Sequence, residues 1–389
     1  MDVATFEWLL TDEGRALLDA AGRAEGDALT VGATLRREHD GDRVAAALTQ
    51  VELRRRAASK FGPLAAQMFF TTDGLEQATR LRVAEHRAAR LQAASVATAV
   101  DLGCGIGGDL VALARAGLTV AGVDLDPVRV AVARANLAAL GLGGAVEVAD
   151  ATLVDTAPFE VAYADPARRS ARGRSFRVDE WTPPWSFVEQ LFARDACVKV
   201  APGIPHALVP AGVEAEWVSD HGEVKEAALW SGRLATDARR ATVIGDGGLV
   251  TVTDSDPTTN EVRPVGRCLY EPDGAVIRAG LVGAVAAGVN GGLIDPKIAY
   301  VTADHAFVTP LARSYEVLEE LPHREKQLRT ALRERHIGRL TIKKRGVSVV
   351  PDELRRRLDL SGDEEATIVL TRAEGRGVCW LVRPFGAAR

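Results

Sequence analysis

The chain of 389 residues is too long for one small core and suits two or three domains. Its 47% hydrophobic and 26% charged residues are typical of a globular protein and exclude a disordered chain. No apolar run reaches the roughly 18 residues of a membrane span, and the acidic N-terminus lacks the pattern of a signal peptide. We therefore expect a cytoplasmic protein with no membrane partner.

Two basic clusters stand out against the net charge of −5, which argues against a protein that coats nucleic acid indiscriminately. Between Glu320 and Arg357 the chain has twelve Lys and Arg residues and five Asp and Glu residues. The second cluster contains five arginines and no acid (Arg168, Arg169, Arg172, Arg174, Arg177). Such stretches are typical either of a polyanion-binding surface or of solvated helix faces, and the sequence leaves both interpretations open.

Hydrophobic periodicity divides the chain into three parts. Residues 1–92 repeat apolar side chains at helical spacing and predict a helical region, in which Thr72 or Asp73 caps a helix. Residues 93–235 alternate short apolar strands with helices, which predicts a parallel sheet with crossover helices. Residues 236–389 predict a small α/β domain.

The expected elements follow from these periods. In the second part they are strands 96–100, 118–123, 146–148, 161–164 and 197–200, with helices 109–116 and 127–140. In the third part they are strands 241–244 and 249–253, helices 276–287 and 322–336, and a hairpin of 366–370 with 378–382. Gly338 is expected to end the basic helix 322–336.

A glycine-rich turn follows the first predicted strand. Gly103, Gly105, Gly107 and Gly108 precede a helix, and their missing Cβ atoms let a nucleotide approach the backbone. Three of them also match the pattern G-x-G-x-x-G of dinucleotide-binding proteins, so the turn alone does not identify the ligand.

Acidic residues at the ends of the predicted strands help to identify the ligand. A dinucleotide would place a pyrophosphate at the turn, where Asp101 would repel it, whereas S-adenosylmethionine carries an ammonium and a sulfonium. The residue therefore favours S-adenosylmethionine and leaves a NAD-dependent dehydrogenase as a minor alternative. Asp124 follows the second strand, where a carboxylate can bind ribose hydroxyls. Asp150 follows the third strand, where it could meet the adenine amine or cap a turn.

These segments, together with Asp165-Pro166, resemble class I methyltransferases over about 140 residues, because they occur in the same order at successive strand ends. The resemblance implies a Rossmann-like sheet with S-adenosylmethionine across the carboxyl ends of its strands. It places Asp101 and the glycines at the methionine part, Asp124 at the ribose and Asp150 at the adenine.

The fourth predicted strand ends in Asp165-Pro166, where amino-methyltransferases of nucleic acids often have Asn/Asp-Pro-Pro-aromatic. An acid and a rigid backbone carbonyl at this position accept hydrogen bonds from the target amine and aim its lone pair at the methyl group. Here Ala167 replaces the second proline and Arg168 replaces the aromatic residue. This departure puts the base-stacking part of the motif in doubt.

Base stacking could instead fall to Phe176, Trp181 or Trp185. The segment Trp181-Thr-Pro-Pro-Trp185 resembles the Ser-Pro-Pro-Trp of cap guanine-N2 methyltransferases, but it comes about seventeen residues late and also suits a helix start. Arg168 and Arg169 could hold a phosphate or form surface ion pairs.

Five segments together resemble a bacterial family of class I methyltransferases with a THUMP-like C-terminal domain. They are Lys60-Phe61, Phe69–Thr79, Asp101–Gly107, Asp165–Arg169 and Tyr270–Arg278. THUMP domains accompany RNA-modifying enzymes, so the resemblance implies an RNA partner such as rRNA or tRNA. Gln77 and Thr79 are further candidates, because segments before the sheet cover the cofactor in cap-methylating relatives.

We therefore expect a methyltransferase that modifies a base nitrogen in RNA, with guanine N2 as a candidate. Asp165 and Pro166 would be catalytic, and Arg168, Arg169 and Trp185 would bind the substrate. The alternatives are a small-molecule methyltransferase and an RNA-binding protein that keeps cofactor affinity without turnover. The four scattered cysteines predict neither a disulfide framework nor a metal site (Cys104, Cys197, Cys268, Cys379).

Overall fold

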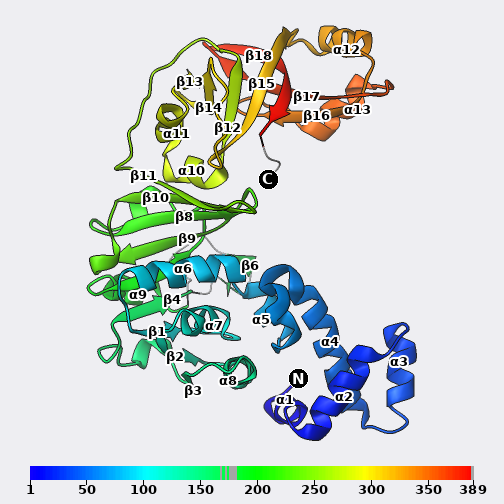
Figure 1. The fold of residues 1–389 in the computed structure, drawn as a ribbon, viewed down its shortest axis with the longest axis vertical. Helices are drawn as coiled ribbons and strands as arrows, with labels where there is room; N and C mark the ends of the chain where they lie inside the picture. Colours follow the sequence, from blue (N-terminus) through cyan, green and yellow to red (C-terminus); the bar gives the residue numbers. More distant parts are fainter. Residues whose placement is uncertain (167–168, 171–172, 175–181, 387–389) are drawn as a thin grey trace. The chain divides into compact units, whose positions relative to one another are not determined.

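The computed structural model describes residues 1–166, 169–170, 173–174 and 182–386 (Figure 1). The chain forms two compact units. The first comprises Met1–Val200, Ala207–Val213 and Ala228–Thr236, and the second comprises Ala201–His206, Glu214–Ala227 and Asp237–Arg389. Strand β9 (Glu223–Ser231) belongs to the second unit up to Ala227 and to the first from Ala228 onward.

The first unit begins with the helices predicted for this part of the chain, drawn in blue to cyan in Figure 1. They are α1 (Val3–Leu9), α2 (Asp12–Arg23), α3 (Ala28–Leu35), α4 (Gly41–Phe61), η1 (Gly62–Ala66), α5 (Thr72–Gln77) and α6 (Leu81–Ala93). Short polar side chains cap most of these helices, since their oxygens satisfy free backbone N–H groups. At α5 the cap is Thr71, whose hydroxyl accepts a hydrogen bond from the Gly74 N–H at 3.0 Å, so the prediction of Thr72 or Asp73 is wrong.

A parallel sheet follows, as the strand–helix alternation predicts. Its strands run in the order β7-β4-β1-β2-β3. The strands are β1 (Thr98–Leu102), β2 (Thr119–Asp124), β3 (Ala145–Val148), β4 (Val161–Ala164) and β7 (Ala196–Val200), with α7 (Gly108–Arg115) and α8 (Pro127–Ala139) as crossover helices. The chain order reverses between β1 and β4, and open α/β sheets bind ligands at the carboxyl ends of such strands.

One hydrophobic core runs through the first unit. It joins Phe6 and Phe61 of the N-terminal helices to Leu110 of α7, Val132 of α8 and Tyr163 of β4. Because the helical region and the sheet bury side chains in the same core, the N-terminal helices hold the segments before β1 in fixed positions. The elements that follow β4 are β5 (Arg169–Ser170), β6 (Gly173–Arg174) and α9 (Trp185–Leu191).

The second unit contains β8 (Glu214–Asp220), β10 (Arg239–Gly245) and β11 (Gly248–Thr253), where β10 pairs with both of the others. It also contains a seven-stranded sheet in the order β13-β14-β12-β15-β18-β17-β16. These strands are β12 (Cys268–Pro272), β13 (Gly292–Asp295), β14 (Ile298–Ala303), β15 (Ala312–Leu321), β16 (Ile337–Lys344), β17 (Glu364–Ala373) and β18 (Arg376–Phe385). The predicted C-terminal hairpin is confirmed, since β17 and β18 pair antiparallel.

Two helix predictions in this unit need correction. The expected helix 276–287 is two helices, α10 (Gly274–Ala279) and α11 (Val282–Gly288), because Gly280 takes a left-handed conformation (φ 71°) that ends the first. The basic helix is α12 (Glu325–Glu334) and ends before Gly338, which lies in β16. A further helix, α13 (Pro351–Leu358), packs with α12 on the same sheet.

Within the described ranges, no helix is long and apolar enough to cross a membrane. The same ranges contain no group of three or more His, Cys, Asp or Glu side chains that could hold a metal ion.

Candidate active site

The glycine turn joins β1 to α7. Gly103, Gly105 and Gly107 have φ angles of 104°, 55° and 78°, a region that side chains with a Cβ atom rarely adopt. No atom lies within 4 Å of where a Cβ atom would sit on Gly103 or Gly105. Gly103 and Gly105 are therefore required by the backbone conformation rather than by crowding, and the turn is open to a ligand on their side, whereas a Cβ atom on Gly107 would also crowd Ala133.

Asp101 lies at the carboxyl end of β1 and is 1% exposed. Among the described residues, its Oδ1 has no hydrogen-bond partner. Burial raises the pKa of Asp101 well above its usual range, nearby Asp109, Asp165 and Asp124 raise it further, and Arg87 lowers it. A buried carboxylate oxygen without a partner is costly in an apo protein, and a ligand cation would satisfy it.

Asp124 ends β2 and is bonded to the turn. One of its carboxylate oxygens accepts the Gly105 N–H at 3.0 Å, and the other accepts the Asp126 N–H at 2.9 Å. Asp150 follows β3 and caps a short 3-10 turn, where its Oδ1 accepts from the backbone and hydroxyl of Thr152 at 2.9 and 2.8 Å. The structure thus places three acidic side chains at the ends of three neighbouring strands.

Asp165 follows β4 on the other side of β1. Its Oδ2 lies 2.6 Å from the ammonium of Lys199 on β7, and the same ammonium donates to the Thr79 hydroxyl at 3.1 Å. The strand register explains this contact, because Ala164 pairs with Val198 and the next residues lie side by side. The sequence offered one signal for Lys199, its place at the end of the fifth strand of the sheet.

The structure describes only some of the remaining predicted site residues. Pro166 is buried next to Asp165. Arg168 lies outside the described residues, as do Phe176 and Trp181, and only the backbone of Arg169 is described, in β5.

Trp185 is the first residue of α9 and is 9% exposed. Its indole N–H donates to Glu189 at 3.0 Å, and its ring packs edge-on against Phe192. The sequence-based view that this segment starts a helix is confirmed.

The N-terminal helices hold the residues around the turn. Lys60 at the end of α4 donates to the carbonyl oxygens of Leu75, Glu76 and Ala78 at 2.7, 2.8 and 3.0 Å, which caps the carboxyl end of α5. This capping fixes the segment that carries Thr79. Lys60 was recognised in sequence only as part of a family segment, and its role as a helix cap depends on the tertiary fold.

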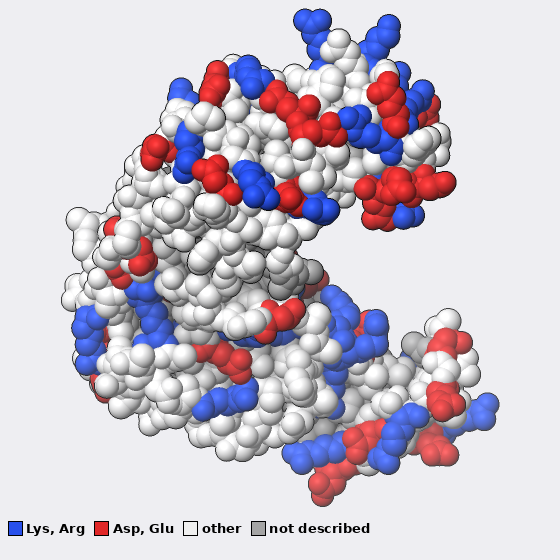
Figure 2. Space-filling view, turned by 45° about the horizontal axis from the view of Figure 1, so that its top comes forward, with Lys and Arg blue, Asp and Glu red and all other residues white. Residues whose placement is uncertain are grey.

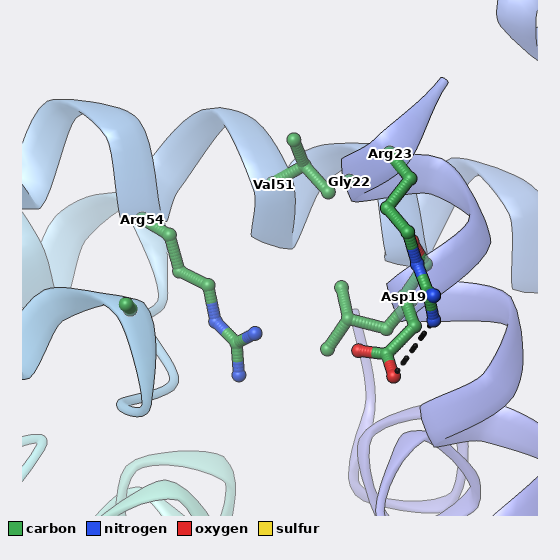
Figure 3. Close-up of a pocket in the computed structure, with 7 residues that line it drawn as sticks. Asp19, Gly22, Arg23, Val51 and Arg54 are labelled. Atoms are coloured by element: carbon green, nitrogen blue, oxygen red, sulfur yellow. Dashed lines mark hydrogen bonds and ion pairs between the residues drawn. The ribbon is translucent and has the colours of Figure 1, made fainter.

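A surface hollow of about 470 Å³ lies between α2, α4 and η1 (Figure 3). Arg54 points into it with its Nε bonded to the Met68 carbonyl at 2.9 Å, and Asp19 and Arg23 form a 3.5 Å pair on the opposite wall. None of the residues that line the hollow belongs to the glycine turn or to the strand ends. It is therefore separate from the candidate active site.

The basic stretch of the second unit contains many ion pairs. On the face drawn in Figure 2, blue and red side chains are interleaved over this unit. Arg335 pairs with Glu319 at 2.7 Å and Arg357 pairs with Glu325 at 2.9 Å. Across the part of the chain that the structure describes, the cations of this stretch without an ion pair include Lys326, Lys344 and Arg356.

The carboxylates at the strand ends offer hydrogen-bond acceptors for a ligand with a cation and hydroxyl groups. The unpartnered oxygen of Asp101 fits an ammonium group, and the free space beside Gly103 and Gly105 leaves room for the chain that carries it. Burial raises the pKa of the Cys104 thiol beside the turn, so this cysteine stays protonated and is a poor nucleophile. These features fit S-adenosylmethionine, whose methionine part carries an ammonium.

Comparisons with known proteins agree with this geometry. A methyltransferase domain model matches residues 99–167, and a model described as THUMP domain-like matches residues 312–384. A model of a domain of unknown function matches residues 2–57. The first of these matches contains the glycine turn and Asp165.

Two related proteins are similar to this chain over more of its length than the domain models are. Two S-adenosylmethionine-dependent methyltransferases, from Mycobacterium tuberculosis strains CDC 1551 and H37Rv, are each 40% identical over 343 residues, which cover 85% of this chain and 94% of each relative. The crystal structure of a candidate methyltransferase from Porphyromonas gingivalis W83 shares the fold, with a TM-score of 0.73 and 20% identity over 98% of this chain and 97% of that one. The chain therefore belongs to the S-adenosylmethionine-dependent methyltransferases.

Proposed function

We propose that the chain methylates an amino nitrogen of a base in RNA, with guanine N2 as the first candidate. The observation that carries the proposal is the position of Asp165, whose carboxylate follows β4 beside the cofactor turn and raises the pKa of Asp101. A hydrogen-bond acceptor at this place would face the methyl group of a cofactor bound at the glycine turn.

Residues at the end of each strand would bind a different part of the cofactor. Asp101 would accept the ammonium of the methionine part, with Gly103, Gly105 and Gly107 against its chain. Asp124 would bind the ribose hydroxyls, and the free oxygen of Asp150 would accept the adenine amine. The division of the chain into 1–92, 93–235 and 236–389 stays part of the same proposal.

Bound S-adenosylmethionine supplies an electrophilic methyl group, so that the lone pair of the base nitrogen forms the new N–C bond while the S–C bond breaks. Asp165 and the carbonyl of Pro166 would accept hydrogen bonds from the target amine and hold its lone pair in line. The surplus N–H proton then leaves to water. Positioning of this kind accounts for most of the barrier reduction in an in-line displacement.

The RNA part of the proposal rests on the second unit. The THUMP domain-like match covers β15 to β18, and THUMP domains accompany RNA-modifying enzymes. Lys326, Lys344 and Arg356 would bind phosphates, as would Arg168 and Arg169, which come soon after Asp165 in the sequence. Trp185 would assist by supporting the wall of the substrate site from the start of α9.

The test uses labelled S-adenosylmethionine with total RNA from a host strain that lacks the gene, beside RNA from its parent. We expect the protein to label only the first RNA. Asp165→Ala removes the acceptor and should abolish labelling, while Asp155→Ala, which removes an exposed turn cap, is the matched control and should keep it. If neither RNA takes up label although S-adenosylmethionine binds, the RNA substrate is wrong and a small-molecule substrate replaces it.

A further inference from the structure

Lys199 occupies an unusual place for a lysine. Its side chain is 16% exposed and lies near the carboxyl end of β7, between Asp165, which follows β4, and Thr79, which follows α5. Moving an ammonium out of water is costly, and a buried ion pair is weak evidence for a gain in stability. The backbone ladder already joins β4 to β7, so the pair is not needed to hold the strands together.

The contact with Lys199 involves only one of the two carboxylate oxygens of Asp165. Oδ2 is held by the ammonium at 2.6 Å, and no hydrogen bond from a described residue reaches Oδ1. The Asp165 side chain is 36% exposed, so it could rotate freely if Lys199 did not hold it. Because Lys199 holds Oδ2, the carboxylate keeps one orientation, in which Oδ1 remains available as an acceptor.

Thr79 holds the lysine in turn. It is 7% exposed, and its hydroxyl accepts from Lys199 at 3.1 Å. Thr79 follows α5, whose last carbonyl groups accept three hydrogen bonds from Lys60. A continuous chain of contacts thus runs from Lys60 through Thr79 and Lys199 to Asp165.

We propose that Lys199, held by Thr79, is a positioning residue that fixes the Asp165 carboxylate so that Oδ1 accepts the hydrogen bond of the target amine. The inference rests on the proposed function for the identity of the amine. The orientation of Asp165 itself is a property of this chain and can be measured without any substrate.

The test compares crystal structures and single-turnover rates of Lys199→Met and Lys199→Arg. Methionine keeps most of the apolar stem and removes the charge, while arginine keeps the charge and can still donate to Asp165. We expect the Asp165 carboxylate to leave its observed orientation in Lys199→Met and to keep it in Lys199→Arg.

The rate of methyl transfer should fall by about 30- to 100-fold in Lys199→Met, because small misplacements at a reacting centre have effects of this size. The KM for S-adenosylmethionine should not change, and Lys199→Arg should recover part of the rate. Thr79→Val should lower the rate less, and Thr79→Ser should restore it. Lys297→Met, an exposed lysine of the second unit, is the control for the loss of one positive charge.

Two outcomes separate this inference from the proposed function. If Asp165 keeps its orientation in Lys199→Met, or if that variant transfers methyl groups at the wild-type rate, Lys199 has no positioning role. If the wild-type protein labels no RNA at all, the proposed substrate is wrong, and the crystal structures alone decide the role of Lys199. Should Lys199→Met fail to fold, Thr79→Val gives the same comparison of Asp165 orientation.

Discussion

Asn136 in α8 holds the backbone of Phe69 in both directions. Its Oδ1 accepts the Phe69 N–H at 2.7 Å, and its Nδ2 donates to the Phe69 carbonyl at 3.1 Å. The same Nδ2 donates to the carbonyl of Ile106 in the glycine turn at 2.8 Å. One fully buried side chain therefore connects the segment before α5 to the glycine turn.

Asn136→Ala should destabilise the protein and weaken cofactor binding together. Three buried backbone groups would lose a partner, and each such loss costs about 1–3 kcal/mol. We expect a fall of about 3 kcal/mol or more in the free energy of unfolding, measured by urea denaturation, and weaker S-adenosylmethionine binding by calorimetry. Gln92→Ala, which removes an exposed amide bonded to Ala116, should cost under about 0.5 kcal/mol. A loss below about 1 kcal/mol for Asn136→Ala would show that the three bonds are not needed.

Asp101→Asn should stabilise the protein at alkaline pH and reduce its affinity for S-adenosylmethionine. The raised pKa means that folded Asp101 holds its proton at pH values where the unfolded residue, near 3.8, has lost it. The free energy of unfolding of the wild type therefore falls as pH rises from about 4 through the folded pKa, and asparagine removes this fall. One pKa unit corresponds to about 1.4 kcal/mol, so we expect a gain of at least that size at pH 8.

Cofactor binding should also release protons, because an ammonium beside Asp101 favours its charged form. Calorimetry in buffers of different ionisation enthalpy measures this release, and the Asp101→Asn variant should show none from this site. Its affinity should fall by roughly 10-fold or more, the effect of losing one charged hydrogen bond. Unchanged affinity in Asp101→Asn would exclude a contact between this carboxylate and the ammonium.

Gly74→Ala in α5 should disturb the glycine turn, because Gly74 packs against Ile106 of that turn. A Cβ atom at this position would lie 2.4 Å from Cγ2 of Ile106 and 2.6 Å from the Thr71 hydroxyl that caps α5. We expect a loss of about 1–3 kcal/mol in stability, since overpacking costs that much, and weaker cofactor binding. Gly41→Ala is the matched control, because no atom lies within 4 Å of its Cβ position. Equal melting temperatures of the two variants would contradict this prediction.

The ion pairs of the second unit predict which cations bind RNA. Lys344→Gln and Lys326→Gln should each weaken RNA binding and lower the slope of log K against log salt by about one. Arg335→Gln removes a cation that already pairs with Glu319 and should leave the slope nearly unchanged. Filter binding at several salt concentrations measures these slopes. If Arg335→Gln lowers the slope as much as Lys344→Gln does, pairing with an acid does not select the RNA-binding cations.

The sequence by itself determined the features that depend on neighbours along the chain. The strand–helix alternation predicted the parallel sheet, and the spacing of Asp101, Asp124 and Asp165 placed them at the ends of successive strands. Because parallel strands end at one edge of a sheet, this local pattern was enough to predict that the acidic residues lie at the same edge. The family segments likewise predicted the THUMP-like domain that the comparisons confirm.

Only the tertiary structure decided which side chains meet across the core. Lys199 and Thr79 are 120 residues apart, and Asn136 and Phe69 are 67 residues apart, so no local periodicity links them. The basic stretch of the second unit shows the same limit. Its charge could be counted from the sequence, but its acidic partners come from other strands and helices. The contacts of Asp165 and the charge that the second unit presents therefore depend on side chains that only folding brings together.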